Sequence, residues 1–176
     1  MKNNISILID EKKLQDRIKE LALEIKKDFG KEEVVFCSVL KGAIFFTVDL
    51  MKNYDGDAII DVVRVSSYVG ENSTGTVDLK IPLKEENIKG KNIIIVEDIV
   101  DTGRTYNFLI DYIKKMNPKC VKTCVMLDKP SRRVKSFENF KADYTGFTID
   151  DLFVIGYGLD YDEKYRNLPY IGYINN

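Results

Sequence analysis

The stretch IIIVEDIVDTGRT, residues 93–105, decides the fold class of this 176-residue chain. Its apolar first half belongs to a strand predicted over 92–99, and a helix is predicted to begin near Gly103 and to run to Met116. A buried strand that leads directly into a helix is typical of a parallel α/β sheet, where ligands bind beyond the carboxyl ends of the strands. We therefore expect the two acids that end the strand to lie at a ligand-binding edge.

The alternation of strands and helices continues on both sides of this stretch. Apolar residues spaced three and four apart predict a helix over 11–29, with Asp10 as its N-cap. A second helix is predicted over 43–53. Further strands are predicted over 34–40, 57–68, 76–83 and 120–127. This order predicts a mostly parallel central sheet that helices cover on both faces.

The end of the chain differs in composition. Residues 137–176 hold 10 of the 19 Phe and Tyr residues, in short apolar segments separated by Gly and Asp. We expect a single domain over 1–176, with a core over approximately 10–130. Residues from approximately 131 to 176 are expected to form a small lobe that packs over the sheet edge.

Composition excludes several classes of chemistry. The chain has no histidine, so Ser-His-Asp catalysis, Cys-His catalysis and histidine metal sites are excluded. A metal would have to be a hard cation, such as magnesium or manganese, held by carboxylates and water. Cys37, Cys120 and Cys124 include no CxxC pair, and we expect them to be reduced, buried thiols.

Charge and hydropathy indicate the partners and the location. The chain has 27 Lys and Arg against 28 Asp and Glu, and a formal net charge of -1 argues against nucleic acid as the main partner. No apolar run approaches the ~20 residues that span a bilayer, and the first residues do not resemble a secretory signal. We therefore expect a cytoplasmic protein with no membrane and no nucleic-acid partner.

The second half of the opening stretch predicts an anion site. Unpaired N–H groups at the start of the predicted helix attract phosphate, and Gly103 allows close approach of the backbone. Thr102 and Thr105 add hydroxyl donors. Glu97 and Asp98 beside them suit a ligand that also carries sugar hydroxyls or a cation. A phosphorylated sugar bound with magnesium meets both needs, whereas the alternative is an N-capped helix beside solvated acids.

The whole stretch resembles the phosphoribosyl diphosphate (PRPP) signature of type I phosphoribosyltransferases, which has an apolar strand, two acids and Thr-Gly-x-Thr. Three further segments resemble the hypoxanthine-guanine members, and the resemblance covers nearly the whole chain. It implies a type I phosphoribosyltransferase-like α/β fold whose small hood lobe comes from C-terminal and N-terminal segments. It also implies PRPP or ribose 5-phosphate contacts from Glu97, Asp98, Asp101, Thr102, Gly103, Arg104 and Thr105.

Two segments resemble the family's pyrophosphate-binding parts. SVLKGA, residues 38–43, resembles the pyrophosphate loop, in which Lys41 and Gly42 would bind the anion and a non-proline cis peptide is frequent. Arg166, in the aromatic tail, would reach the same group.

RVSSY, residues 64–68, resembles the loop that closes over the family's site, and Ser67 and Tyr68 match its Ser-Tyr pair. Closure would keep water from the reactive ribosyl centre. Read locally, the same residues are a hairpin connection.

DKPSRR, residues 128–133, resembles the segment whose lysine recognises the purine 6-oxo group, which here would be Lys129. The two arginines that follow in this segment are assigned no role. In the tail, Phe153 would stack on the purine and Val154 would meet its edge through backbone groups. Asp160 belongs to the same purine-binding lobe and would also hold magnesium.

The resemblance implies transfer of the 5-phosphoribosyl group from PRPP to N9 of a 6-oxopurine, with Mg2+ as cofactor. Asp101 is the candidate general base near purine N7, and the magnesium ligands would be Glu97, Asp98 and Asp160. Family members are usually dimers or tetramers, so a homodimer or homotetramer is expected.

Other functions compete with this reading. A non-catalytic relative that senses nucleotides and binds RNA or DNA needs a basic face, and the chain has no Lys/Arg block. A phospho-acceptor signalling domain explains the paired acids but leaves the Thr-Gly-Arg-Thr loop and the aromatic tail without a purpose. An adenine- or orotate-specific transferase is disfavoured by the segments around Lys129 and Phe153.

Overall fold

The computed structural model of the chain describes residues 4–67 and 77–175. α1 (Glu11–Phe29) forms where its apolar spacing predicts it. The Asp10 carboxylate caps it, accepting a hydrogen bond from the Lys13 N–H at 2.8 Å. Gly30 ends it with a φ of 59°, a left-handed conformation that glycine adopts without steric cost.

Within the described residues, the central sheet has six strands in the order β4-β3-β2-β5-β6-β7. β4 runs antiparallel to β3, and all other neighbours are parallel. The bounds are β2 Val34–Leu40, β3 Ala58–Ser67, β4 Val77–Ile81, β5 Asn92–Val100, β6 Cys120–Asp128 and β7 Tyr144–Thr148. The predicted mostly parallel sheet is confirmed, and β7 is a strand that the sequence analysis did not place in it.

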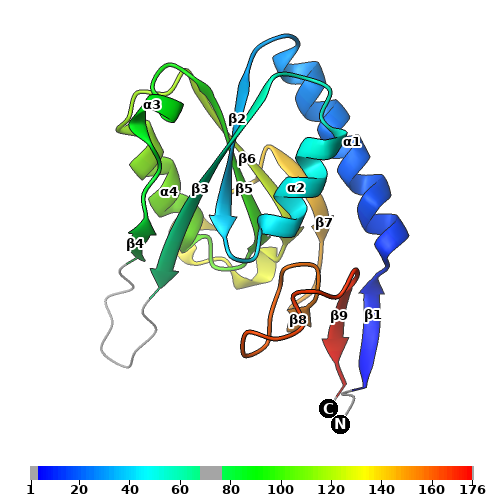
Figure 1. Cartoon of the computed structure of the whole chain (residues 1–176). Coiled ribbons are helices and arrows are strands. Elements are labelled where there is room, and N and C mark those ends of the chain that lie inside the picture. The colour runs from blue at the N-terminus through cyan, green and yellow to red at the C-terminus, as the bar shows by residue number, and fades with distance from the viewer. Residues whose placement is uncertain (1–3, 68–76, 176) are drawn as a thin grey trace.

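Helices cover both faces of this sheet (Figure 1). α1 and α2 (Ile44–Asn53) lie over one face, and α3 (Glu85–Ile88) and α4 (Arg104–Lys114) lie over the other. Successive residues of β5 point to opposite faces, so Ile94 packs with the α1 side and Ile95 with the α4 side. A strand buried on both faces explains why 93–96 is continuously apolar.

A smaller antiparallel sheet forms a second lobe, which we call the hood: strands β1 (Ile5–Ile9), β8 (Val154–Ile155) and β9 (Ile171–Ile174), with the connections between residues 149 and 170. β1 pairs with β9, so the two ends of the chain lie side by side (Figure 1). The hood's sheet therefore contains an N-terminal strand, as the family resemblance implies.

The two sheets divide the chain differently from the expected boundary near residue 130. β7 continues the core sheet because it pairs in parallel with β6, and Tyr144 at its start is buried. β1 belongs to the hood although it precedes residue 10. A five-residue strand whose partner lies more than 160 residues away leaves no local signal for the lobe to which it belongs.

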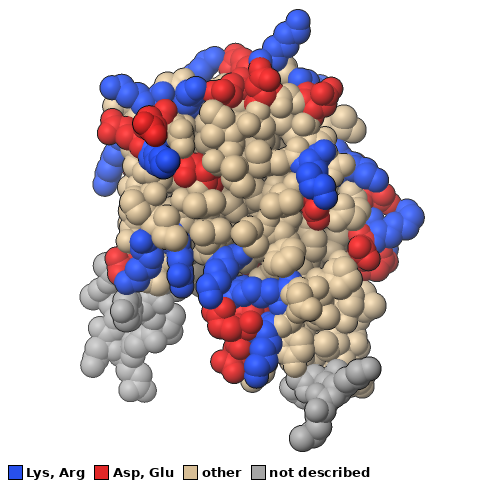
Figure 2. All heavy atoms as spheres, in the orientation of Figure 1, with Lys and Arg blue, Asp and Glu red and all other residues tan. Residues whose placement is uncertain are grey.

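Between β6 and β7 the chain forms two short 3-10 helices, η1 (Pro130–Arg132) and η2 (Lys135–Phe137). Positive and negative side chains intermix over the face seen in Figure 2. Among the described residues, no helix combines the length and the apolar character needed to cross a membrane. The three cysteines are free thiols; two are buried as predicted, and Cys120 is only half-buried.

Candidate active site

The parallel register of the sheet brings the residues at the ends of β5 and β6 together. Val100 on β5 is the register partner of Asp128 on β6, and the N–H of Lys129 donates to the carbonyl of Val100 at 3.0 Å. Asp101 and Lys129 therefore follow two neighbouring strands directly. The predicted general base and the predicted purine-binding lysine lie at one edge of the sheet, as expected for parallel strands.

Residues 101–103 form the turn between β5 and α4 that the sequence predicts to bind phosphate. Gly103 has a φ of 83°, and α4 begins at the next residue, which turns the helix N–H groups toward the loop. The turn encloses a cavity of about 80 Å³, lined in part by Thr102, Gly103 and Thr105. A small, amide-rich cavity at a helix start suits one phosphate group. Arg104, also predicted to contact PRPP, is exposed.

The two acids on β5 face opposite ways, because successive residues of a strand alternate. Glu97 lines the phosphate-loop cavity and is 7% exposed, and burial raises its pKa well above the ordinary value. Asp98 faces Gly42 in the predicted pyrophosphate loop, and burial raises the pKa of its carboxyl to about 6. Among the described residues, neither carboxylate forms an ion pair with Lys or Arg.

The predicted pyrophosphate loop has the cis peptide that the resemblance implies, between Leu40 and Lys41. Gly42 packs so closely on Asp98 that a β-carbon there would lie 1.7 Å from Asp98 Oδ2. Gly158 of the hood, with a φ of 97°, packs on the same loop, and a β-carbon there would lie 2.0 Å from the Gly42 carbonyl oxygen. Two glycines thus allow β5, the loop and the hood to meet.

Both predicted pyrophosphate-binding cations contact hood carboxylates. Lys41 Nζ lies 2.8 Å from Glu163 Oε2, and Arg166 Nη2 lies 2.8 Å from Asp160 Oδ1 and 3.5 Å from Glu163 Oε2. Arg166 also donates to the carbonyl of Gly158 at 2.6 Å. Glu163 therefore lies between the two cations, where an anionic ligand is predicted to bind.

At the other end of the site, Lys129 is buried, and its ammonium donates to the carbonyl of Leu152 at 2.8 Å. Asp151 Oδ1 lies 3.2 Å from the same nitrogen. Arg132 connects Asp151 to Asp101, the predicted general base. Its Nη1 lies 3.6 Å from Asp151 Oδ2, and its Nε lies 3.2 Å from Asp101 Oδ1. A chain of alternating charges thus joins the core edge to the hood.

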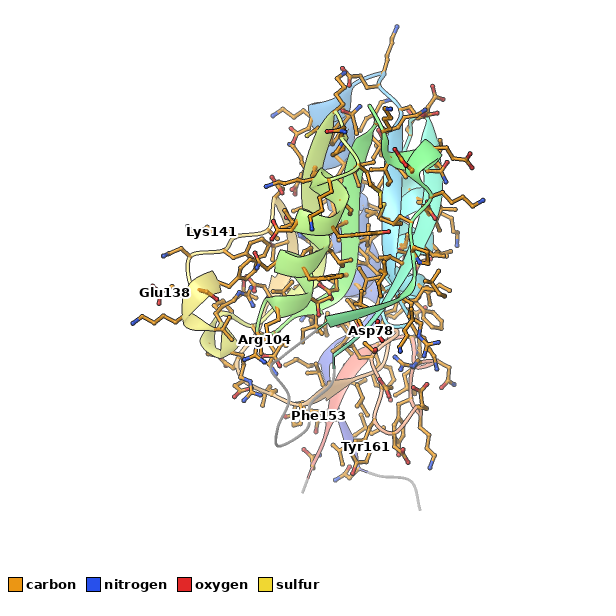
Figure 3. The ribbon with its side chains drawn as sticks, turned by 90° about the vertical axis from the view of Figure 1, so that its left-hand side faces the viewer. Asp78, Arg104, Glu138, Lys141, Phe153 and Tyr161 are labelled. Carbon is orange, nitrogen blue, oxygen red and sulfur yellow. The ribbon has the colours of Figure 1, made fainter. Side chains whose placement is uncertain are left out.

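The predicted stacking residue, Phe153, is not a core residue, because 63% of it is exposed. Its ring meets that of Tyr161 edge to face at 5.6 Å, and Figure 3 shows both rings in the hood, beyond the end of the central sheet. Val154 is buried in β8, where it pairs with Tyr173 of β9. An exposed aromatic ring on a strand-anchored loop is suited to stacking on a planar base.

The structure therefore brings most of the predicted residues to one sheet edge and the facing hood. Ser67 ends β3, and Tyr68 lies outside the described residues. The predicted magnesium trio is not one group: in the described part of the chain, no three His, Cys, Asp or Glu side chains gather to hold a metal. Glu97 lies on the far side of β5 from Asp98, which explains the difference.

Sequence reasoning missed Asp151, Arg132, Arg133 and Glu163 as site-lining residues. The first three lie within or near segments that the resemblance had already singled out, so their proximity in sequence was a usable signal. Glu163 also lies in such a segment, between Asp160 and Arg166, but its contact with Lys41 joins residues 122 positions apart and had no signal in the sequence.

Comparison with known proteins agrees with this geometry. The family model described as the phosphoribosyl transferase domain matches residues 5–162. The hypoxanthine-guanine phosphoribosyltransferase of Bacillus subtilis is 41% identical over 175 residues, which cover 98% of this chain and 94% of that protein. This chain belongs to the phosphoribosyltransferase family. Its relatives place it in the hypoxanthine-guanine branch, as the sequence motifs indicated.

A solved structure of a hypoxanthine-guanine phosphoribosyltransferase from Bacillus anthracis superposes on this phosphoribosyltransferase with a TM-score of 0.90. It is 46% identical, and the match covers 97% of this chain and 98% of that one. The "Bifunctional protein TilS/HprT" of Listeria innocua is 43% identical over 175 residues, but this chain spans only 26% of its length. The type I phosphoribosyltransferase fold is confirmed.

Proposed function

We propose that this phosphoribosyltransferase transfers the 5-phosphoribosyl group of PRPP to N9 of hypoxanthine, and of guanine, giving IMP or GMP and pyrophosphate. The observation that carries this proposal is the position of buried Lys129 beside Asp101, at the edge that also holds the phosphate loop. An ammonium donor at that place favours a base with a 6-oxo acceptor over adenine, which presents an amino group there.

The reaction forms a bond from N9 of the purine to C1′ of the ribose and breaks the bond from C1′ to the pyrophosphate oxygen. Positive charge develops on the ribose and negative charge on the leaving group, so fixed charges and positioning supply most of the rate. Lys41 and Arg166 neutralise the pyrophosphate, and the loop 101–105 holds the 5-phosphate. Asp101 accepts the proton that leaves purine N7.

The carboxylates fit a hard cation. Asp98 is half-buried and forms no ion pair among the described residues; burial raises its pKa, the charge of Arg166 opposes this, and the Asp160 carboxylate adds to it. Two carboxylates plus substrate oxygens and water are the usual ligands of Mg2+ in such sites. Asp98 and Asp160 would hold it, and the bound ion would supply further charge neutralisation for the leaving pyrophosphate. Glu97 stays among the proposed PRPP-binding residues.

Phe153 would stack on the base, and the backbone around Val154 would meet its edge. We further propose that residues 1–176 act as one domain, as a homodimer or homotetramer in the cytoplasm, without nucleic-acid or membrane partners. Ser67 and Tyr68 keep their proposed place in a loop that closes over PRPP.

A PRPP- and magnesium-dependent assay with hypoxanthine, guanine, xanthine and adenine tests the function. We expect nucleotide from hypoxanthine and guanine and none from adenine. Asp101→Asn should lower kcat far more than it weakens PRPP binding, and equal losses would contradict the general-base role. Folded protein that binds PRPP but turns over no base would favour the non-catalytic regulator.

A further inference from the structure

Arg133 lies at the junction of the two strands that lead into Asp101 and Lys129. We propose that Arg133 is a positioning residue that fixes the separation of Asp101 and Lys129, and so the orientation in which the purine base is held. The proposal rests on the proposed function, because it concerns how that site accepts its base.

The contacts of Arg133 go mainly to backbone. Its Nη1 donates to the carbonyl of Val100 at 2.8 Å, of Asp101 at 2.6 Å and of Lys129 at 3.4 Å. Its Nη2 donates to the carboxylate of Asp128. Only 3% of the side chain is exposed, so water offers these carbonyls little competition.

These hydrogen bonds lie at the end of the pairing between β5 and β6. The β5–β6 register ends at Val100 and Asp128, and one further backbone hydrogen bond, from the Lys129 N–H to the Val100 carbonyl, joins the strands beyond it. The Arg133 guanidinium donates hydrogen bonds to carbonyls that follow both strands, so Asp101 and Lys129 are held by one rigid group. The planar guanidinium has several donors in a fixed arrangement, whereas the ammonium of a lysine is a point charge on a flexible stem.

A purely structural role would not require an arginine at this position. Burying a cation is costly, and apolar side chains of similar volume often stabilise a protein as well as a buried ion pair does. The guanidinium nevertheless lies under the site, over the Phe140 ring at 5.7 Å, and its Nε has no hydrogen-bond partner in the described part of the chain.

The neighbouring Arg132 acts differently and does not duplicate this role. Arg132 is half-exposed and contacts the Asp101 side chain, whereas Arg133 is buried and contacts the Asp101 backbone. A ligand that binds the Asp101 carboxylate can displace Arg132. The hydrogen bond from Arg133 to the Asp101 carbonyl does not depend on what the carboxylate binds.

The chain offers a matched control in Arg17. This arginine of α1 donates to the carbonyls of Thr145 at 2.8 Å and Gly146 at 3.2 Å, both in β7, and none of these residues belongs to the proposed site. Arg17→Met and Arg133→Met each remove a guanidinium that joins sheet carbonyls. Only the second change should affect base use.

The experiment compares wild type, Arg133→Met, Arg133→Lys and Arg17→Met by thermal unfolding and by steady-state kinetics with hypoxanthine and PRPP varied separately. We expect Arg133→Met to lower kcat/KM for hypoxanthine by about 100-fold, the scale of a displacement of about 1 Å at a reacting group. The KM for PRPP should change by less than about threefold. Arg17→Met should lower the melting temperature and leave both kinetic parameters near wild type.

Arg133→Met leaves the Asp128 carboxylate without its cation, so Arg133→Lys keeps the test decisive if the first variant does not fold. Arg133→Lys retains the charge and should recover most of the stability, with kcat/KM for hypoxanthine still at least about tenfold low because the fork is lost. Hypoxanthine kinetics restored by lysine, or parallel losses for PRPP and base, would overturn the proposal. Wild-type protein that forms no nucleotide contradicts the proposed function itself, which separates the two failures.

Discussion

At the proposed pyrophosphate end of the site, 47% of the Lys41 side chain and 65% of that of its partner Glu163 are exposed. At the proposed purine end, only 8% of the Lys129 side chain is exposed. Exposed ion pairs contribute about 0–1 kcal/mol, so a phosphate oxygen can replace Glu163 with little loss. A neutral base offers no such charge, and its recognition needs a donor that is already held in place. The Leu152 carbonyl and Asp151 hold Lys129 in that way.

This difference in exposure implies that substitutions have different effects at the two ends. The pyrophosphate end depends on close backbone packing around exchangeable side chains, and the purine end depends on the buried side chains themselves. Substitutions at each end, and the pH dependence of stability, test this difference.

The largest effect should come from Gly42→Ala, which attacks the packing of the pyrophosphate end. The new methyl group would lie 1.7 Å from Asp98 Oδ2, so either the loop or the acid must move. We expect kcat/KM for PRPP to fall by about 100-fold, as for a displacement of about 1 Å. Gly30→Ala is the control, since nothing lies within 4 Å of its β-carbon; it should reduce stability only. Wild-type kinetics in Gly42→Ala would contradict this expectation, because they would show that the loop accommodates the methyl group without loss of PRPP use.

Lys129→Gln tests the purine end directly. Loss of a hydrogen bond from a charged group costs about 1.5–3 kcal/mol, so kcat/KM for hypoxanthine should fall roughly 10- to 100-fold. The KM for PRPP should stay near its wild-type value. Lys119→Gln, which breaks an exposed pair with Glu32 outside the site, should leave both unchanged. A loss shared equally between PRPP and base would mean that the two ends are not separable.

The raised pKa of Asp98 predicts a pH dependence of stability in metal-free protein. Burial raises this pKa from 3.8 to about 6, so the folded state binds more protons than the unfolded state between these values. The free energy of unfolding should therefore fall as pH rises through 6, by about 1 kcal/mol between pH 5 and pH 7 from this group. Urea unfolding of wild type and Asp98→Asn at both values isolates it. The same slope in both proteins would assign the effect to other acids.

The smallest effect should come from Glu163→Gln. Removing the carboxylate that competes for Lys41 and Arg166 should lower the KM for PRPP by at most about fivefold, the scale of an exposed ion pair. The effect should shrink in high salt. Asp162→Asn, one position earlier in the same turn, is the matched control and should leave the KM unchanged. A KM that rises in Glu163→Gln would mean that Glu163 supports the cations instead of competing with the ligand.

How far sequence reasoning reaches can be traced residue by residue. Residues 93–105 are contiguous, so their buried strand, the turn after it and the helix start were predictable from local chemistry. The contact of Gly42 with Asp98 was not, because it depends on β2 lying beside β5. The role proposed for Arg133 needed the β5–β6 register in the same way.

The hood was the least predictable part. β8 has two residues and β1 has five, so neither is long enough to show a clear period. The resemblance to the family supplied the roles of Phe153 and Asp160, which no spacing rule indicated. The pairing of Glu163 with Lys41 depends on how the hood sits on the core and was found only in the structure.

The pairing of β1 with β9 has a consequence for how the protein is made. Ile5 pairs with Ile174, so during synthesis β1 stays without its partner until about 165 further residues have been added. At about 5–20 residues per second, that delay is on the order of 10–30 s. The core sheet, built from neighbours closer in sequence, can form within this interval. A nascent chain would thus complete the proposed phosphate loop before the hood that is proposed to bind the base.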